Sequence, residues 1–284
     1  MSLFTCTECQ RILGIEEFKI KDPATGRRSR KCKECHKRTD RLYQRNKRTQ
    51  GGNWLFFGCI HLPFEHPDAL AWLKHLHDKY GFTKIVMLGD WYDWGGLNRF
   101  MKNPNMPSPL QEYQRTIEVR QQWYEAFPEV ECITGNHDLR PLLRAGEAYL
   151  PDIILKDIRE VMGFPAGWKQ HGSQLLLNHS LLGEVLCIHG DKVNKNALTN
   201  AKACGKNIVM ADRHTMCNVG WCETMMGERR FGINTGAMID AEREAFAYCR
   251  GRMMKPLIAV GAIIDGNPVN LVMPVDAQNR WRDR

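Results

Sequence analysis

The sequence predicts an α/β protein: a two-sheet sandwich with helices on both outer faces, preceded by a small separate module. Short apolar runs that indicate buried strands alternate with helical segments through the middle of the chain. Further short strands follow residue 207, and we expect them to form a second sheet. Four cysteines within the first 35 residues predict the small module.

Composition limits the class of protein. The chain of 284 residues is long enough for one large domain and one small domain. It contains no run of about 18 apolar residues, so we expect no membrane span. The first residues, Met1 to Thr5, do not resemble a signal peptide, and eleven cysteines therefore favour reduced thiols and metal ligands over disulfides. We expect a cytoplasmic protein.

The charge is unevenly distributed. Residues 1–50 hold 14 Lys and Arg against 6 Asp and Glu, whereas the other residues hold 26 of each. The whole formal charge of +8 therefore belongs to the first 50 residues. This distribution favours a polyanionic partner, and nucleic acid (DNA or RNA) is the partner we expect. The alternative is a solvated basic surface that aids solubility.

The N-terminal cysteines form two CxxC pairs, Cys6–Cys9 and Cys32–Cys35, with 22 residues between them. Each pair can bring two sulfurs to one tetrahedral ion, so this spacing predicts one structural Zn²⁺. His36 is an alternative ligand. A segment this short has too small a core to fold without the metal. The arrangement resembles the treble-clef or ribbon-like zinc modules that accompany phage endonucleases.

A basic helix is expected after the second CxxC pair, over residues 33–48. Its arginines are the candidate nucleic-acid contacts: Arg38, Arg41, Arg45 and Arg48. The glycines at 51 and 52 indicate a flexible joint. We therefore expect a basic zinc-binding module at residues 1–50 and a larger domain at residues 51–284.

Five apolar runs in the larger domain each end in residues that can bind metal. The polar residues that follow them are Cys59 and His61; Asp90 and Asp93; Asn136, His137 and Asp138; His189; and Asp212 and His214. Parallel strands of one sheet end at the same edge, so these residues could converge. Nitrogen, oxygen and one sulfur ligand together suit Mn, Fe or Zn, and the number of ligands suits two ions. Individually, His189 could be structural and Cys59 a small core residue.

The remaining elements follow in chain order. Residues 67–80 predict a helix with Pro67 in its first turn and Gly81 as its stop. Residues 110–127 predict a long amphipathic helix that ends before Pro128. We also expect helices at residues 139–149, 152–162 and 196–204, and strands at residues 175–177, 219–223, 230–234, 257–264 and 269–273.

The order of these motifs resembles the calcineurin-like metallophosphoesterases, and the layout is similar to the small phosphoesterases encoded by phages. The family pattern is Asp-x-His, Gly-Asp-x-x-Asp, Gly-Asn-His-(Asp/Glu), His-Gly and Gly-His-x-His. The matching stretches are Cys59 to His61, Gly89 to Asp93, Gly135 to Asp138, His189 to Gly190 and Ala211 to His214. Two positions depart from the pattern: Cys59 replaces Asp, and Asp212 replaces the first His of the last motif.

The resemblance implies a two-metal centre. Asp90 would bridge both ions. The first ion would be completed by Cys59, His61 and His214, and the second by Asn136, His189 and Asp212. A metal-activated hydroxide would attack phosphorus in line.

The resemblance also implies an acid and its partner. His137 would donate a proton to the leaving group or a hydrogen bond to the phosphate. Asp93 would orient His137 and stabilise its protonated form.

Three functions follow from these observations. The first is a nuclease or phosphodiesterase that hydrolyses nucleic acid, because the motifs supply the chemistry and the basic module supplies the contact. The second is a phosphomonoesterase that acts on a protein or a nucleotide. The third is a catalytically inactive nucleic-acid-binding scaffold, because Cys59 and Asp212 alter the metal ligands.

Overall fold

The computed structural model of this chain describes residues 3–22, 25–37, 51–99, 103–249 and 251–282. The chain forms two compact units, Met1–Gln50 and Gly51–Arg284. Each unit is described by itself. Within the described residues, no helix is both long and apolar enough to cross a membrane.

The N-terminal unit consists of two β-hairpins followed by helical residues 33–37. Its elements are β1 (Leu3–Thr5), β2 (Ile12–Gly14), the 3-10 helix η1 (Ile15–Glu17), β3 (Phe18–Asp22) and β4 (Arg27–Cys32). Three of its four cysteines are buried together with Phe18, and Cys9 is half-buried beside them. The small core is therefore built around the thiols, as the sequence predicted for a zinc module.

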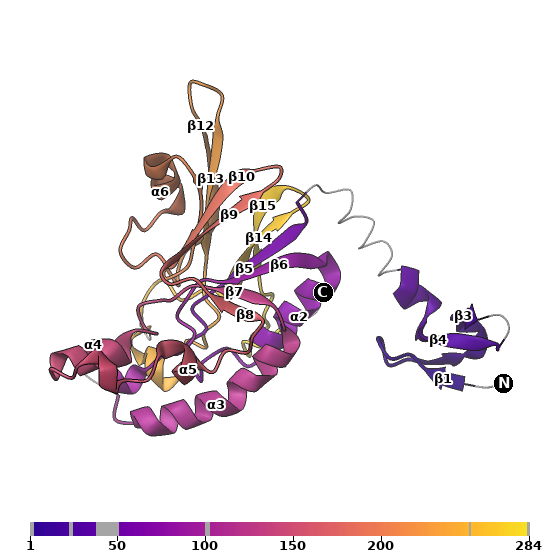
Figure 1. Cartoon of the computed structure of the whole chain (residues 1–284), viewed down its shortest axis with the longest axis horizontal. Coiled ribbons are helices and arrows are strands. Elements are labelled where there is room, and N and C mark those ends of the chain that lie inside the picture. Colours follow the sequence, from indigo (N-terminus) through magenta and orange to yellow (C-terminus); the bar gives the residue numbers. More distant parts are fainter. Residues whose placement is uncertain (1–2, 23–24, 38–50, 100–102, 250, 283–284) are drawn as a thin grey trace. The chain divides into compact units, whose positions relative to one another are not determined.

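The first sheet of the larger unit has six strands in the order β15-β14-β5-β6-β7-β8 (Figure 1). Strands β5 to β8 run parallel, and β14 pairs antiparallel with β5. The bounds are β5 (Asn53–Phe57), β6 (Phe82–Met87), β7 (Val130–Cys132), β8 (Trp168–Gln170), β14 (Ala259–Ile264) and β15 (Asn267–Val272).

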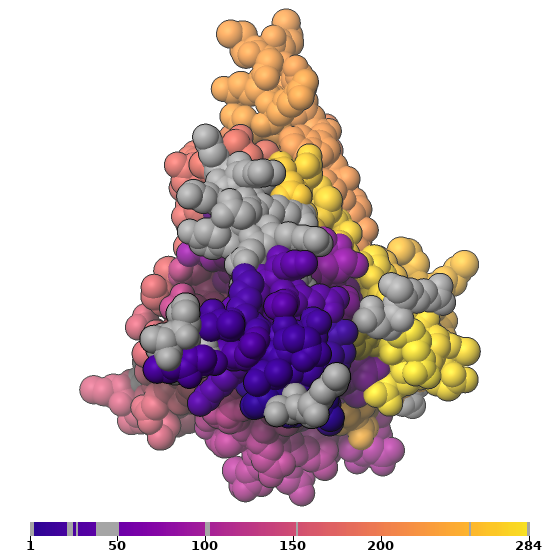
Figure 2. All heavy atoms as spheres, turned by 90° about the vertical axis from the view of Figure 1, so that its right-hand side faces the viewer, coloured from indigo at the N-terminus to yellow at the C-terminus, as the bar shows by residue number. Residues whose placement is uncertain are grey.

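The second sheet has five strands in the order β12-β13-β11-β10-β9. Strands β10, β11 and β13 are parallel, and β9 and β12 are antiparallel edge strands. The β12–β13 hairpin extends beyond the rest of this unit (orange in Figures 1 and 2). The bounds are β9 (Gln174–His179), β10 (Gly183–Ile188), β11 (Asn207–Met210), β12 (Cys217–Glu223) and β13 (Arg229–Thr235).

Helices cover the outer faces of the two sheets. The chain places α2 (Ala69–Tyr80) and α3 (Pro109–Ala126) against the six-stranded sheet and α6 (Ala197–Cys204) against the five-stranded sheet. Helix α2 stops where Gly81 takes a left-handed conformation, and α3 begins at a capping box formed by Ser108 and Gln111. The other helical elements are η2 (Gly95–Leu97), α4 (Arg140–Glu147), η3 (Asp152–Ile154), α5 (Ile158–Met162) and η4 (Glu244–Cys249).

Strand β5 shows how one segment builds both cores. All five of its residues are buried. Leu55 and Phe57 belong to the core under the helices, whereas Trp54 and Phe56 belong to the core between the sheets. Because alternate side chains of a strand point to opposite faces, a continuous apolar run is what a strand covered on both sides requires.

The predicted sandwich is confirmed, but two predicted sheet memberships are wrong. The sequence placed the five metal-motif strands in one sheet, whereas β10 and β11 belong to the second sheet. It also placed every strand after residue 207 in the second sheet, whereas β14 and β15 extend the first sheet beside β5. An apolar run indicates that a strand is buried but does not encode its pairing partner, which long-range packing decides.

Candidate metal centre

The predicted site residues lie where strands of both sheets end. The loop after β5 is held against the loop after β6, because Cys59 N donates to Gly89 O at 3.0 Å and His61 N to Asp90 O at 3.0 Å. The backbone is left-handed at four of these residues, with φ between 51° and 58°: Cys59, His61, Asp90 and Asp212. Each such residue costs about 1–3 kcal/mol, and this strain concentrates at functional sites.

Glycine allows the loops to approach closely. A Cβ on Gly135 would lie 2.2 Å from Asp90 Oδ1, and a Cβ on Gly89 would lie 2.4 Å from Gly135 N. Only residues without a side chain fit at these two positions. The glycines of the second and third motifs therefore place the Asp90 and Asn136 loops side by side.

The first ligand cluster contains Cys59, His61, Asp90 and His214. Their ligand atoms all lie within 4.8 Å of one another. His61 Nε2 is 3.2 Å from His214 Nε2 and 3.5 Å from Asp90 Oδ2. These separations suit ligands that are each about 2.0–2.3 Å from one central ion.

The second ligand cluster gathers around His189. Its Nε2 is 3.1 Å from Asp90 Oδ2, 3.0 Å from Asn136 Oδ1 and 3.7 Å from Asp212 Oδ1. The same Asp90 oxygen therefore faces both clusters. The structure brings together all seven predicted metal ligands, with Asp90 between the two groups.

The tautomers of two histidines follow from their other contacts. His61 Nδ1 lies 2.8 Å from Asp93 Oδ1, and His189 Nδ1 lies 2.7 Å from the Leu88 carbonyl oxygen. Since both partners are acceptors, each Nδ1 carries the proton, and each Nε2 lone pair faces the cluster. Such contacts orient histidines that bind metal.

The site has more buried acceptors than buried cations. Asp90, Asp93 and Asp138 are at most 2% exposed. Asp212 Oδ2 pairs with Arg213 Nη1 at 2.9 Å but lies outside hydrogen-bond geometry, so this buried oxygen makes no hydrogen bond. Burial and nearby carboxylates raise the pKa of Cys59 well above its ordinary value, so its thiolate requires a neighbouring cation. The residues fit two divalent ions.

His137 and Asp93 lie beside the ligand clusters. His137 Nδ1 is 3.0 Å from Asp93 Oδ1 and 3.0 Å from the Asp93 carbonyl oxygen. Burial works against a charged His137, but Asp90 and Asp93 outweigh it and raise the pKa of the imidazole. Burial likewise opposes the Asp93 carboxylate, but hydrogen bonds from His137 and His61 lower its pKa. The contact suits the partner role predicted for Asp93. The acid role of His137 requires a proton on Nε2, which faces the Arg140 guanidinium at 2.7 Å, so Arg140 must give way to a substrate oxygen at this position.

Two residues outside the predicted ligand set and the predicted catalytic pair support the site. Asp138 accepts hydrogen bonds from the backbone N–H groups of Asp90, Trp91, Tyr92 and Gly135, at 2.8–3.1 Å. Arg140 Nη2 lies 2.7 Å from His137 Nε2, and its Nη1 donates to the Asp93 carbonyl oxygen at 2.8 Å. Asp138 occupies the acidic last position of the third motif, and this position could have predicted its role in the site. No motif position predicts a role for Arg140.

The N-terminal cysteines also come together. All four sulfurs lie within 4.8 Å of one another, with Cys6 to Cys35 at 3.8 Å and Cys9 to Cys32 at 4.0 Å. Four sulfurs at 2.3 Å from a tetrahedral zinc ion would be about 3.8 Å apart, so the geometry fits a zinc site. His36 Nε2 instead contacts Ser29 Oγ at 2.5 Å. The helical residues directly after Cys32 fit the treble-clef alternative.

The four predicted nucleic-acid contacts are not placed. They lie outside the described residues: Arg38, Arg41, Arg45 and Arg48. Their role stays a prediction.

The sandwich and its ligand clusters define a metal-dependent hydrolase. Residues 53–215 match the family described as calcineurin-like phosphoesterase, which is more than half of the chain. The chain therefore belongs to the calcineurin-like phosphoesterase family, as its motifs predicted. Members bind divalent metals in the active site, so the protein is a metal-dependent hydrolase of phosphoester bonds.

Three solved structures illustrate the similarity. Vps29 from Chaetomium thermophilum is 12% identical, with 82% of this chain and 93% of that chain covered and a TM-score of 0.43. YfcE, a phosphoesterase from E. coli, is 16% identical, with 74% and 87% covered and a TM-score of 0.35. Vacuolar protein sorting 29 from Cryptosporidium parvum is 13% identical, with 78% and 96% covered and a TM-score of 0.38. A search of curated protein sequences finds no match.

Proposed function

We propose that the protein hydrolyses phosphodiester bonds of nucleic acid, as a nuclease or phosphodiesterase. The observation that carries this proposal is a cavity of about 540 Å³ beside His137. Its lining includes Arg140 and Arg252, the aromatic ring of Tyr248 and the amide of Asn98, together with the carboxylates of Asp93 and Glu244. The volume is in the range of sites for nucleotide-sized ligands.

The outer wall of this cavity suits a nucleotide. The Arg252 guanidinium lies 5.0 Å from the centre of the Tyr248 ring, and Tyr248 remains 54% exposed. An arginine can contact phosphate, and an exposed aromatic ring can stack on a base. A diester has a second substituent on phosphorus, and this cavity offers space for it next to His137.

Each side chain then has a role in the reaction. The metals would be held by two sets of ligands that share Asp90. The first set adds Cys59, His61 and His214, and the second adds Asn136, His189 and Asp212. When bound, the ions supply Lewis acidity at phosphorus and lower the pKa of bound water. His137, held by Asp93, protonates the leaving oxygen. Arg140 contacts His137 Nε2 and is placed to bind a phosphate oxygen that enters this position.

The test compares chromogenic substrates. The protein, loaded with Mn²⁺, Zn²⁺ or Fe²⁺, should hydrolyse an aryl phosphodiester with a higher kcat/KM than the corresponding monoester, and it should cut oligonucleotides. Arg252→Ala should raise KM for an oligonucleotide. Lys255→Ala should not, because Lys255 pairs with Glu242 and does not line the cavity. A preference for the monoester would favour the phosphatase alternative, and no turnover with any metal would favour the scaffold.

A further inference from the structure

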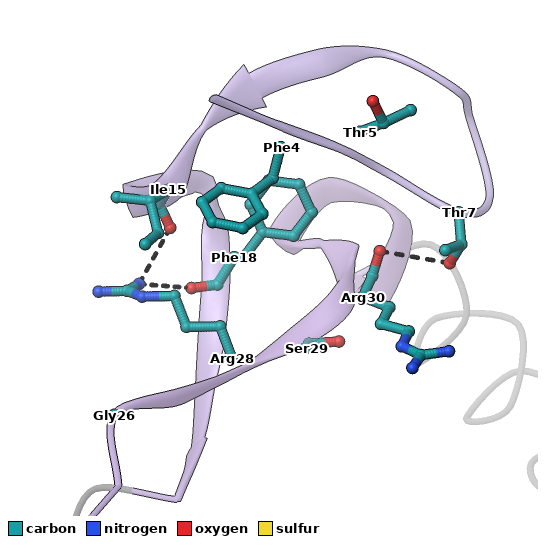
Figure 3. A pocket seen from close by; sticks show the side chains of 9 residues that line it. All are labelled: Phe4, Thr5, Thr7, Ile15, Phe18, Gly26, Arg28, Ser29 and Arg30. Carbon is teal, nitrogen blue, oxygen red and sulfur yellow. Dashed lines mark hydrogen bonds between the residues drawn. The ribbon is translucent and has the colours of Figure 1, made fainter. Parts of the chain in front are cut away.

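The N-terminal unit contains a pocket whose lining includes none of the four cysteines. Its volume is about 550 Å³ (Figure 3). It lies between the β1 segment and the β3–β4 hairpin, and its lining comprises Phe4, Thr5, Thr7, Ile15, Phe18, Gly26, Arg28, Ser29 and Arg30. A pocket of this size can hold a planar ring system.

Two phenylalanines give the pocket an aromatic surface. Phe18 is 3% exposed and packs in the small core with the cysteines. Phe4 meets it edge to face, with ring centres 6.2 Å apart, yet remains 48% exposed. The buried ring therefore holds the exposed ring in place. A supported ring with an open face is suited to stacking against another planar group.

Two arginines flank this aromatic surface. Arg28 Nη1 donates to the carbonyl oxygens of Ile15, at 3.0 Å, and Phe18, at 2.8 Å, so its guanidinium is fixed at one side of the pocket. Arg30 lies at the other side, beside Thr7, whose hydroxyl donates to the Arg30 carbonyl oxygen at 3.2 Å (Figure 3). Charge-assisted hydrogen bonds from such groups favour a ligand that carries phosphates.

The strand that supplies both arginines is strongly basic. Four of the six residues of β4 are Arg or Lys. Glu16 and Glu17 of η1 offset part of this charge near Ile15. Leu3, Ile12 and Ile20 are also exposed on this unit, which would suit an apolar peptide. The basic strand and the net charge of residues 1–50 favour a polyanion over such a peptide.

We propose that this pocket binds one unpaired base of a single-stranded nucleic acid. The base stacks on Phe4, and Arg28 and Arg30 contact the phosphates on either side of it. A paired base is already stacked within its duplex, so the pocket selects single strands. The inference rests on the proposed function, because it specifies the form of nucleic acid that the hydrolase takes.

The test uses the full zinc-loaded chain with His137→Ala, which removes the catalytic acid, so that bound oligonucleotides remain largely uncut. The probe is a short oligothymidylate with one 2-aminopurine. Binding to the chain with an unchanged pocket should quench the fluorescence of the 2-aminopurine. This chain should also bind the single strand more tightly than its duplex. Phe4→Ala should weaken binding roughly 5- to 100-fold. Phe4→Trp should restore binding, and Arg30→Ala should lower its salt dependence.

Leu3→Ala is the matched control, because Leu3 is 65% exposed on the same strand but does not line the pocket. Unchanged zinc content shows that each variant is folded. Three results would overturn the inference. They are equal single-strand affinity with and without Phe4→Ala, tighter binding of duplex than of single strands, and tighter binding of an apolar peptide. If the chain with His137 intact cuts oligonucleotides normally in such a case, the proposed function stands. If a small diester is hydrolysed but no oligonucleotide is bound, the nucleic-acid part of the proposed function fails as well.

Discussion

Asp93 connects the proposed metal ligands to the proposed catalytic acid. One of its oxygens contacts both His61 and His137, at 2.8 and 3.0 Å. The carboxylate therefore fixes the ring of His61, a proposed metal ligand, and the ring of His137, the proposed acid, at the same time. Its replacement would disturb both metal binding and proton transfer. A cleaner separation of these two effects needs changes at residues that take part in only one of them.

Cys59 is such a residue for metal binding. Cys59→Asp restores the carboxylate of the family pattern and removes the soft ligand. We expect the preference for Zn²⁺ over Mn²⁺ to fall by roughly 10- to 100-fold, the scale of changes made around metal sites. Competition binding followed by metal analysis measures it. Cys187→Ala is the control, because Cys187 is buried in the core between the sheets. An unchanged preference would mean that Cys59 is not a ligand.

In the proposed mechanism, His137 is the corresponding residue for catalysis. His137→Ala should leave metal content unchanged and lower kcat by roughly 10²- to 10⁴-fold, the usual share of a general acid. The exposed His171, which pairs with Glu131 at 2.6 Å, gives the control variant His171→Ala. The measurement is hydrolysis of a small diester at saturating metal. A fall in kcat below 10-fold would remove His137 from the reaction.

The sequence could predict that these side chains lie close together, because each one follows an apolar strand. Position in a motif was enough to predict this for Cys59, Asp90 and His137. It was not enough for Arg140 or Glu112, whose contacts depend on where helices α4 and α3 pack. Glu112 lies in an amphipathic helix, and periodicity alone predicts a charged side chain there to be solvated, whereas it is 1% exposed.

At the scale of elements, helix α3 anchors the loop that follows Asp93. Glu112 accepts hydrogen bonds from Gly95 N at 2.9 Å and Gly96 N at 3.0 Å. Gly96 leaves room for Pro109 at the start of the helix, since a Cβ there would lie 2.9 Å from the proline ring. The loop beside the cavity is thus positioned by a carboxyl group that the fold has buried.

Burial, followed by the nearby Asp93, raises the pKa of Glu112 to about 7 from the ordinary value of 4.5. The folded state therefore binds more protons than the unfolded state between these values, and stability falls as pH rises from 4.5 to 7. The contribution is at most about 3 kcal/mol. Glu112→Gln should flatten this part of the stability curve in urea unfolding. Glu118→Gln, on the exposed side of the same helix, should not. Parallel curves for wild type and Glu112→Gln would contradict the prediction.

The N-terminal unit gives a second prediction at this scale. Cys32→Ser removes one of four sulfurs around a core that contains little besides them and Phe18. We expect one fewer zinc ion per chain and unfolding of residues 3–37, because metal binding supplies the folding free energy of such a unit. Proteolysis with zinc analysis measures both. Residues 51–284 should resist the protease as before, and Cys204→Ser, at an exposed cysteine, should retain the zinc. Equal zinc content in Cys32→Ser and wild type would count against the site.

At the scale of the whole molecule, the fold class could be predicted from the alternation of strands and helices, but the division of strands between sheets could not. The run at residues 259–264 has the same apolar character as the strands of the second sheet, yet it pairs with β5. Strands pair through the hydrogen-bonding groups at their edges, and long-range packing decides which edges meet. The predicted ligands lie close together because both sheets end their parallel strands at one edge.

The charge distribution predicts that one unit binds nucleic acid and the other hydrolyses it. Residues 1–50 carry the whole net charge of +8, and residues 51–284 carry the cysteine, histidine, aspartate and asparagine side chains of the metal centre. Each phosphate that a Lys or Arg neutralises adds about 0.9 to the slope of log affinity against log salt for duplex DNA and about 0.7 for single strands.

Removal of residues 1–50 should therefore weaken oligonucleotide binding and flatten its salt dependence, while hydrolysis of a small diester stays nearly unchanged. Binding isotherms at several salt concentrations, with the diester assay on the same samples, measure both. The variant Arg229→Ala in the full chain is the control, because it removes a positive charge that pairs with Glu223 on the larger unit. If the truncated protein binds single strands as tightly as the full chain at every salt concentration, contact with nucleic acid lies in the larger unit. The cavity beside His137 then becomes the surface to test.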